Sequence, residues 1–271
     1  MTFDMNRAWR EAAEMVTANR EVLLIVAGLF FFLPSLAFAL FVPAPVPASG
    51  MAPEAAMNML TKFYSDNAFW LLAMAVAQTV GFLTVLALLR DRAKPTVGEA
   101  LKRAIIGILP YLAAQILAAL AIVLVFGVLI GVATATGLAP LIALVAIAAV
   151  VVMFYVMIKI SLTPAVIAIE RQNNPIAILK RSWTLTKGNS FRLFLFFALL
   201  LIAVGIAALV IGGVFGLLFA VVGSGTVSQV GEAAISGLIG AVATVYFVAI
   251  LASIHRQLAG LSPEAISETF E

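Results

Sequence analysis

The side chains that could take part in chemistry are few, and most of them are cations. The 271-residue chain has sixteen Lys and Arg, thirteen Asp and Glu, one His and no Cys. Without Cys, no thiolate nucleophile, disulfide or cysteine metal site can form. The one His, His255, stands beside Arg256 at the end of an apolar run, where a cation complements the helix dipole. We therefore expect a structural rather than a catalytic role for His255.

Sequence motifs of catalysis are absent. There is no HExxH sequence, nucleophile elbow or phosphate-cradling glycine loop, and no apolar run contains two carboxylates. The spacings Gly127-x-x-x-Gly131 and Gly212-x-x-x-Gly216 are typical of helix packing within one chain. We predict that the protein is not an enzyme and has no cofactor and no metal ligands.

The most strongly patterned stretch is Asn173–Arg192, with the sequence NNPIAILKRSWTLTKGNSFR. Its Asn-Asn-Pro start can cap and begin a helix, and Gly188 can end it. Apolar side chains share one face of this helix, while Lys180 and Lys187 lie on the flank. Long apolar runs on both sides argue against a soluble core. The pattern therefore predicts an interfacial helix over residues 175–187 at a membrane surface.

Cations at such a surface can contact anionic lipid head groups. Each Lys or Arg near an anionic surface adds about 1 kcal/mol, and Arg can bond a phosphate directly. In the alternative, Arg181 pairs with Glu170 or Glu99 and only braces the loops. Lys159 either lies in the membrane or reaches its surface by snorkelling. The candidates for lipid contact are Arg103, Lys159, Lys180, Arg181, Trp183, Lys187 and Arg192.

Composition places these residues in an integral membrane protein. The chain is 64% hydrophobic and 11% charged, with a mean hydropathy of +1.16, whereas soluble domains have about 45–50% apolar and about 25% charged residues. Because about 20 helical residues cross a hydrocarbon core of about 30 Å, we predict an all-α, polytopic fold. Its six transmembrane helices are expected over residues 22–42, 69–89, 108–133, 141–163, 191–222 and 233–254. The fifth run is too long for one upright helix, so we expect a bend near Gly212–Gly213.

Shorter segments complete the predicted architecture. Residues 1–20, 95–106 and 175–187 are expected to form three short amphipathic helices, and residues 43–68 an extracytoplasmic loop. A pattern of polar, Arg, small and bulky apolar residues recurs at 6–9, 102–105 and 180–183. It suggests a pseudo-threefold repeat of helix plus hairpin, although chance similarity among interfacial helices would give the same pattern.

The distribution of cations predicts the orientation. Fifteen of the sixteen Lys and Arg residues fall in alternate segments, 1–20, 90–107, 159–192 and 255–271, and the sixteenth is Lys62. Because positive charges near membrane ends favour the cytoplasm, both termini and the basic loops are expected there. Such localised charge does not suit a nucleic-acid-binding surface, which needs a basic face on a soluble body.

Residues 164–194 resemble a pattern found in a broad set of bacterial membrane proteins. These are similar to the membrane domain attached to some glycerophosphodiester phosphodiesterases and to related stand-alone proteins. The resemblance implies a polytopic helical fold in the bacterial cytoplasmic (inner) membrane. It implies no activity, because the phosphodiesterase chemistry belongs to a separate soluble domain, which we do not expect in this chain. The matching residues are Pro164, Glu170, Ala177, Arg181-Ser182-Trp183, Leu185-Thr186 and Gly188.

The expected function is a non-enzymatic membrane protein that engages anionic lipids or partner proteins at the cytoplasmic leaflet. One alternative is a carrier or channel for a lipidic or apolar solute, and another is a membrane anchor for a separate soluble enzyme. A continuous cavity would favour the carrier, and a dry, packed bundle would favour the first interpretation. Gln78 and Gln115, in the second and third crossings, could line a polar path or form interhelical hydrogen bonds.

Overall fold

The protein is an all-α protein in the computed structural model, which describes residues 2–42, 45, 48, 50–90, 95–222 and 225–260. No strand occurs among these residues, so the predicted fold class is confirmed. The helices are α1 (Met5–Ala18), α2 (Arg20–Ala27), η1 (Gly28–Phe32, a π-helix), α3 (Leu33–Phe41), α4 (Pro53–Asp66), α5 (Ala68–Leu88), α6 (Val97–Ala135), α7 (Ala139–Ile160), α8 (Thr163–Glu170), α9 (Pro175–Leu185), α10 (Ser190–Val222) and α11 (Thr226–Ala259).

Six helical stretches among the described residues are long and apolar enough to cross a membrane. This agrees with the predicted number of crossings, and the chain is a multi-pass membrane protein. The stretches are Arg20–Phe41, Ala68–Leu88, Val97–Ala135, Ala139–Glu170, Ser190–Phe219 and Thr226–Ala259. The fourth includes the short α8, which follows α7 where the prediction had one helix ending at residue 163.

The predicted separate helix over residues 95–106 is wrong, because it continues into the third crossing as α6. The predicted start is right: Thr96 accepts from the Glu99 amide at 3.3 Å, and Glu99 accepts from the Thr96 amide at 3.0 Å. Pro110 lies inside α6 and does not end it. Within an apolar run, leaving the helix would expose unpaired backbone groups to hydrocarbon, so the helix continues. Of the three short helices predicted, those over residues 1–20 and 175–187 are separate helices in the structure, α1 and α9.

Helix-breaking residues have different effects in the fifth and the first crossing. The helix α10 runs unbroken from Ser190 to Val222, so no interruption marks the bend expected at Gly212–Gly213. The first crossing, in contrast, contains η1 just before Pro34. The Leu33 amide bonds to the Gly28 carbonyl five residues back. Pro34 removes a regular helical donor, and this wider turn lies next to it.

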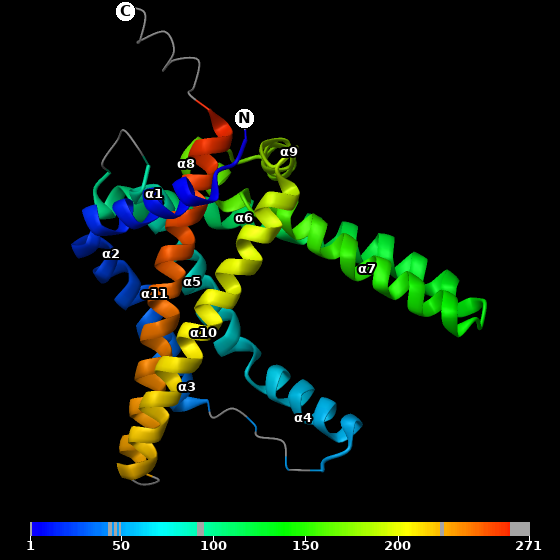
Figure 1. Cartoon of the computed structure of the whole chain (residues 1–271), viewed down its shortest axis with the longest axis horizontal. Helices are drawn as coiled ribbons and strands as arrows, with labels where there is room; N and C mark the ends of the chain where they lie inside the picture. The colour runs from blue at the N-terminus through cyan, green and yellow to red at the C-terminus, as the bar shows by residue number, and fades with distance from the viewer. Residues whose placement is uncertain are drawn as a thin grey trace, which may run out of the picture.

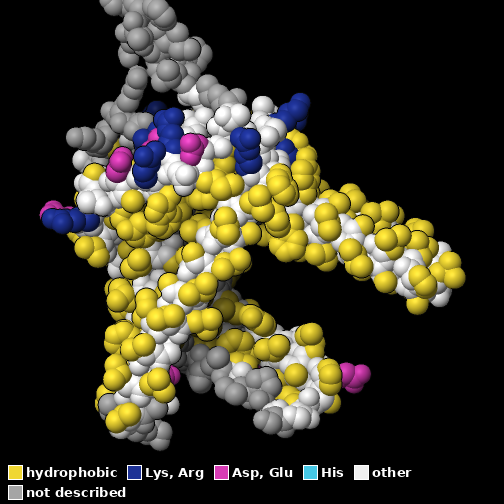
Figure 2. All heavy atoms as spheres, viewed as in Figure 1, with side chains coloured by type: hydrophobic (Ala, Val, Ile, Leu, Met, Phe, Trp, Pro, Cys, Tyr) yellow, Lys and Arg dark blue, Asp and Glu magenta, His cyan; other side chains and the backbone are white. Residues whose placement is uncertain are grey.

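The helices meet at one end of the molecule and diverge from it (Figure 1). We call this end, formed by α1, α8, α9 and the last turns of α11, the basic end, because Lys and Arg side chains gather there in Figure 2. Both described ends of the chain lie there as well. From the basic end, α10 and α11 descend together, while α7 extends to the side. The predicted loop 43–68 contains α4, and part of that loop lies outside the described residues.

The densest packing lies at the basic end. Every residue of α8 from Thr163 to Ala168 is buried, and so is every residue of α11 from Val248 to His255. These two stretches pack against α1, α5, α6 and α9. The basic end is therefore the packed core from which the other helices extend.

Candidate lipid-binding site

A large apolar groove lies between α10 and α11, and α1, α5 and the last turns of α7 line its end nearest the basic end. Its volume is about 1170 Å³, and nearly all of its lining residues are hydrophobic or aromatic. Polar lining is limited to a few side chains, which include Ser161 and Thr244. We call this space the groove.

The groove is long enough to follow a lipid chain through a leaflet and beyond. Along α10 its lining extends from Phe194 to Phe215, which corresponds to about 32 Å of helix. A hydrocarbon core is about 30 Å thick. Three small residues, Ala198, Ala207 and Ala243, leave room between the larger lining side chains. The shape therefore suits an extended apolar ligand.

The end of the groove nearest the basic end is lined by Trp9 and Ala13 of α1 and by Ser161. The Trp9 ring is stacked on Tyr246, with centroids 6.0 Å apart and an angle of 19° between the planes. Trp and Tyr combine an apolar ring with a polar group and favour the level of lipid head groups. This end of the groove thus has the composition of a membrane-water boundary.

One carboxylate ties three helices together at the basic end. Glu170, which ends α8, accepts two hydrogen bonds from the Arg181 Nε of α9, at 3.0 and 2.9 Å. His255 of α11 donates to the same carboxylate, with Nε2 2.9 Å from Oε1. The pairing of Arg181 with Glu170 that the sequence offered as an alternative therefore exists. The buried His255 completes the junction.

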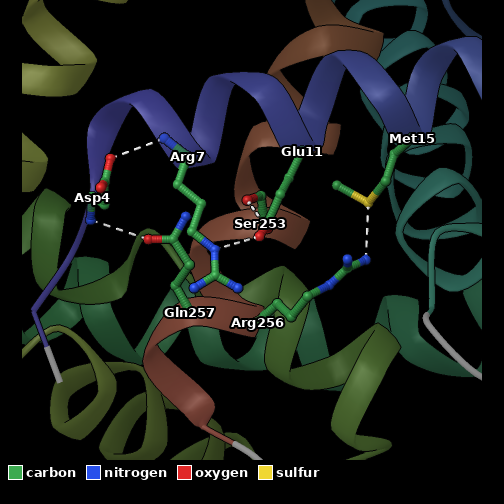
Figure 3. A network of polar contacts seen from close by, with 7 residues as sticks. All are labelled: Asp4, Arg7, Glu11, Met15, Ser253, Arg256 and Gln257. Carbon is green, nitrogen blue, oxygen red and sulfur yellow. Dashed lines mark hydrogen bonds and ion pairs between the residues drawn. The ribbon is translucent and has the colours of Figure 1, made fainter.

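A second network joins α1 to α11 (Figure 3). Glu11 accepts from the Ser253 hydroxyl at 2.7 Å and from the Arg7 Nε at 2.6 Å. Asp4 caps α1 by accepting from the Arg7 amide, and its own amide donates to the Gln257 side chain. Partial burial raises the pKa of Glu11, but the hydrogen bonds from Ser253 and Arg7 outweigh it and hold that pKa below its ordinary value.

Lys159 is enclosed by protein in the last turn of α7. Its side chain is 2% exposed, and its Nζ lies 5.4 Å from the ring centroids of both Tyr155 and Trp183. This geometry is a cation–π contact with two rings. The Lys159 carbonyl accepts from the Ser182 hydroxyl of α9 at 2.7 Å. Within the described part of the chain no carboxylate pairs with Lys159, so it joins α7 to α9 instead of reaching the surface.

The other sequence-predicted candidates lie apart from the groove. Lys180, Lys187 and Arg192 are exposed, Trp183 is 42% exposed, and Arg103 is half-buried on α6. None of the seven candidates, all of which are described, lines the groove. Lys159, Trp183 and Arg181 therefore take part in contacts between helices, Arg103 is half-buried, and the exposed cations Lys180, Lys187 and Arg192 remain available for head groups.

The groove was missed because the helices that line it are apolar on every side. In α10 the lining residues recur at three- and four-residue intervals, from Phe194 and Phe197 to Leu201 and Val204. Equally apolar residues stand between them, so periodicity carries no signal. Only Trp9, an aromatic residue in a polar helix, could have marked the entrance.

Among the described residues, no group of three or more His, Asp or Glu side chains could hold a metal ion. Comparison with curated proteins and with solved structures gave no significant match. A family model described as "Domain of unknown function (DUF7847)" matches residues 4–258. Since this match spans nearly the whole sequence, the chain belongs to the DUF7847 family of domains of unknown function.

Proposed function

We propose that this protein binds membrane lipid, with acyl chains in the groove and an anionic head group at the basic end. The observation that carries the proposal is a bilayer-length apolar groove that begins at the basic end, the end of the molecule where Lys and Arg side chains gather. Ligand pockets commonly enclose about 300–1,000 Å³. The groove, at about 1170 Å³, has room for a ligand of lipid size.

The physical basis is the cost of leaving the groove unfilled. Side chains that line an empty apolar space lose their dispersion contacts on one side. Water is a poor filler, because it needs two or more polar partners and the lining offers few. An acyl chain restores these contacts. A lipid held there would also add contacts to α10 and α11, the helices that form most of the lining.

The head group would be selected by charge. Lys180 and Lys187 of the α9 region are exposed, and each can add about 1 kcal/mol near an anionic group. Arg181 is already engaged by Glu170, so we assign it to bracing and exclude it from the head-group site. Partner proteins at this surface, the other predicted ligand class, would need no groove.

The membrane and orientation belong to the same proposal. The resemblance of residues 164–194 favours a bacterial inner membrane, and the distribution of Lys and Arg favours a cytoplasmic basic end. The chain has no Cys, so single cysteines at Lys187 and Ser228 can be labelled with an impermeant reagent in intact cells. We expect labelling at residue 228 alone; labelling at residue 187 would reverse the orientation.

A carrier function is a second candidate, because the groove follows nearly the whole apolar length of α10. Such a path could conduct a lipid between leaflets. In liposomes with a fluorescent lipid and an external quenching reductant, a carrier would expose the inner-leaflet dye. If only the outer half of the dye is quenched, the protein binds lipid without moving it between leaflets.

Native mass spectrometry of the purified protein tests the proposal. Ala207 lines the groove, so Ala207→Phe should remove most co-purified lipid. Ala203→Phe is the matched control, because Ala203 is exposed on α10 outside the groove. The double variant Lys180→Gln, Lys187→Gln should keep lipid but lose the preference for anionic over zwitterionic species. Equal lipid content in Ala207→Phe and Ala203→Phe would overturn the groove assignment.

A further inference from the structure

A second, smaller cavity, open on one side, lies between α3, α5, α6 and α11. Its volume is about 360 Å³. Ser35 stands fifteen residues after the start of α2, and Thr244 fifteen residues before the end of α11. Both positions are about 22 Å along the helix from the basic end. Thr244 is also two residues from Tyr246 of the Trp9–Tyr246 pair, so the cavity lies about one helical turn from the head-group end of the groove.

This cavity differs from the groove in its chemistry. None of the described residues that line it is charged, yet Ser35, Gln78, Thr79, Tyr111 and Thr244 bring polar atoms to it. Polar side chains in hydrocarbon are costly unless they have partners. A ligand or water that bonds to the remaining donors and acceptors would therefore be stabilised in this cavity.

The hydrogen bonds in the cavity leave some donors and acceptors of the lining side chains unused. Gln78 donates one Nε2 hydrogen to the Ser35 Oγ at 3.4 Å, and the amide keeps a second hydrogen and its carbonyl oxygen. The Tyr111 hydroxyl accepts from Gln115 at 3.2 Å and still has its own proton to donate. Gln78 thus forms the interhelical bond expected for it, whereas the bond of Gln115 stays within α6.

The two threonines supply acceptors instead. Thr244 donates to the Gly240 carbonyl and Thr79 to the Ala75 carbonyl, both at 2.8 Å. Their hydroxyl protons are therefore used, and only their lone pairs remain. The cavity consequently offers donors from Gln78 and Tyr111 and acceptors from both threonines.

The backbone beside the cavity is built to hold this space open. Phe31 belongs to η1, and Ser35 follows one turn later in α3. Short π-helical turns inside α-helices occur frequently at functional sites. Close packing fixes the neighbouring helix, since a Cβ at Gly81 of α5 would lie 2.5 Å from the Phe30 Cβ. The cavity is thus framed by a tight contact and is not a gap between loosely packed helices.

We propose that this cavity binds the uncharged, carbonyl-bearing ring of a membrane-soluble quinone. A ring fits among Phe31, Phe82 and Tyr111, and its carbonyl oxygens match the donors of Gln78 and Tyr111. Charged head groups are excluded because no lining residue offers a counter-charge. Phe82 and Thr244 line both the cavity and the groove, so an isoprenoid tail leaves past these residues. The inference goes beyond the proposed lipid function and does not depend on it.

A larger side chain at Gly240 would fill the cavity. Gly240 lines the cavity, and a Cβ added there meets no atom within 4 Å, so Gly240→Leu fills space without a backbone clash. Gly212→Leu is the matched control, because a Cβ at Gly212 is equally free and Gly212 lies on exposed α10 outside both cavities. Thermal unfolding in detergent verifies that both variants fold.

The test is equilibrium binding of ubiquinone with one isoprenoid unit to the purified full-length chain. We expect saturable binding to the wild type and to Gly212→Leu, and at least a tenfold loss in Gly240→Leu. Tyr111→Phe should weaken binding several-fold by removing one donor. If Gly240→Leu does not fold, Thr244→Val replaces it as the lining variant, with a several-fold loss expected.

Three results would overturn the inference: no saturable binding to the wild type, equal binding by Gly240→Leu and Gly212→Leu, or tighter binding of dioctanoylglycerol than of the quinone. The groove variant Ala207→Phe separates the two proposals. It should lose co-purified lipid and keep quinone binding, because Ala207 lines the groove and does not line the cavity. Failure of the lipid proposal would therefore leave the quinone result intact, and the reverse also holds.

Discussion

The basic end and the diverging helices differ in what their side chains pack against. In the most apolar 18-residue stretches of α6, α7–α8 and α10, 6% of the residues are buried, against 39% in α5 and α11. At the basic end, α8 and the last turns of α11 are buried continuously. Packing between helices therefore fixes the fold at the basic end, while the long helices keep most of their surface in contact with lipid.

Polar contacts follow the same division. Glu170 and Glu11 each collect donors from two residues at the basic end. Along α10 the sequence from Phe194 to Val222 contains no side chain that could form an ion pair. Since lipid tails are as apolar as Leu, the long helices gain little by leaving lipid for each other. Stability should therefore depend on the basic end and lipid content on the groove.

The largest predicted effect is the difference in stability between two isoleucine-to-alanine variants, one in each region. Ile254 is fully buried in α11, and Ile202 is 58% exposed on α10. Ile254→Ala should lower the free energy of unfolding by about 2–5 kcal/mol, and Ile202→Ala by less than about 0.5 kcal/mol. Denaturant unfolding in detergent measures both. Similar losses would mean that the two regions contribute alike.

Removing the carboxylate that joins three helices should have the next largest effect. Glu170→Gln leaves Arg181 and the buried His255 without a charged partner, at a cost of about 1–3 kcal/mol. Glu14, exposed on α1, provides the control Glu14→Gln. Thermal unfolding should separate the two variants. If Glu14→Gln is equally destabilised, the Glu170 junction is not a brace.

A smaller loss is expected where α9 is held to α7. Ser182→Ala removes the hydrogen bond to the Lys159 carbonyl, and a bond of this kind contributes about 1 kcal/mol. Thr184→Ala removes a hydroxyl that bonds only within α9, so it should cost less. The difference between their unfolding midpoints measures the contact, and reversed order would contradict it.

The smallest predicted effect is a pH dependence centred on Glu11. Because the pKa of Glu11 is lowered in the fold, its ionised form stabilises the protein above the ordinary value of 4.5. That stabilisation is lost as the pH falls through the folded pKa. Wild type should therefore unfold at a higher temperature than Glu11→Gln at pH 7, and the gap should narrow below about pH 4.5. A gap that stays constant with pH would exclude this role.

Hydropathy and local capping were enough to predict the helices. Six apolar runs became six crossings, and the expected cap of α9 is present, with Asn174 accepting from the Ile176 and Ala177 amides. These features depend on neighbours in sequence. Helix ends inside apolar runs were less predictable, because hydrocarbon keeps a helix intact across Pro110 and Gly212.

The candidate sites depended on packing that no local pattern records. Lys159 looked like a membrane or surface residue, but two rings from α7 and α9 enclose it. The pairing of Arg181 with Glu170 could be offered only as an alternative to lipid contact, since the sequence does not say how the helices meet. The groove lies between α10 and α11, and a space left between two uniformly apolar helices has no signature in their sequences.

Photocrosslinking tests most directly whether the groove retains lipid. A benzoylphenylalanine is placed at Phe197, which lines the groove, or at Leu209, which is 77% exposed outside it. In native membranes both positions should crosslink to lipid. After exchange into detergent, the account predicts that lipid crosslinks persist at Phe197 and disappear at Leu209. Loss of crosslinks at both positions would contradict a lipid held in the groove.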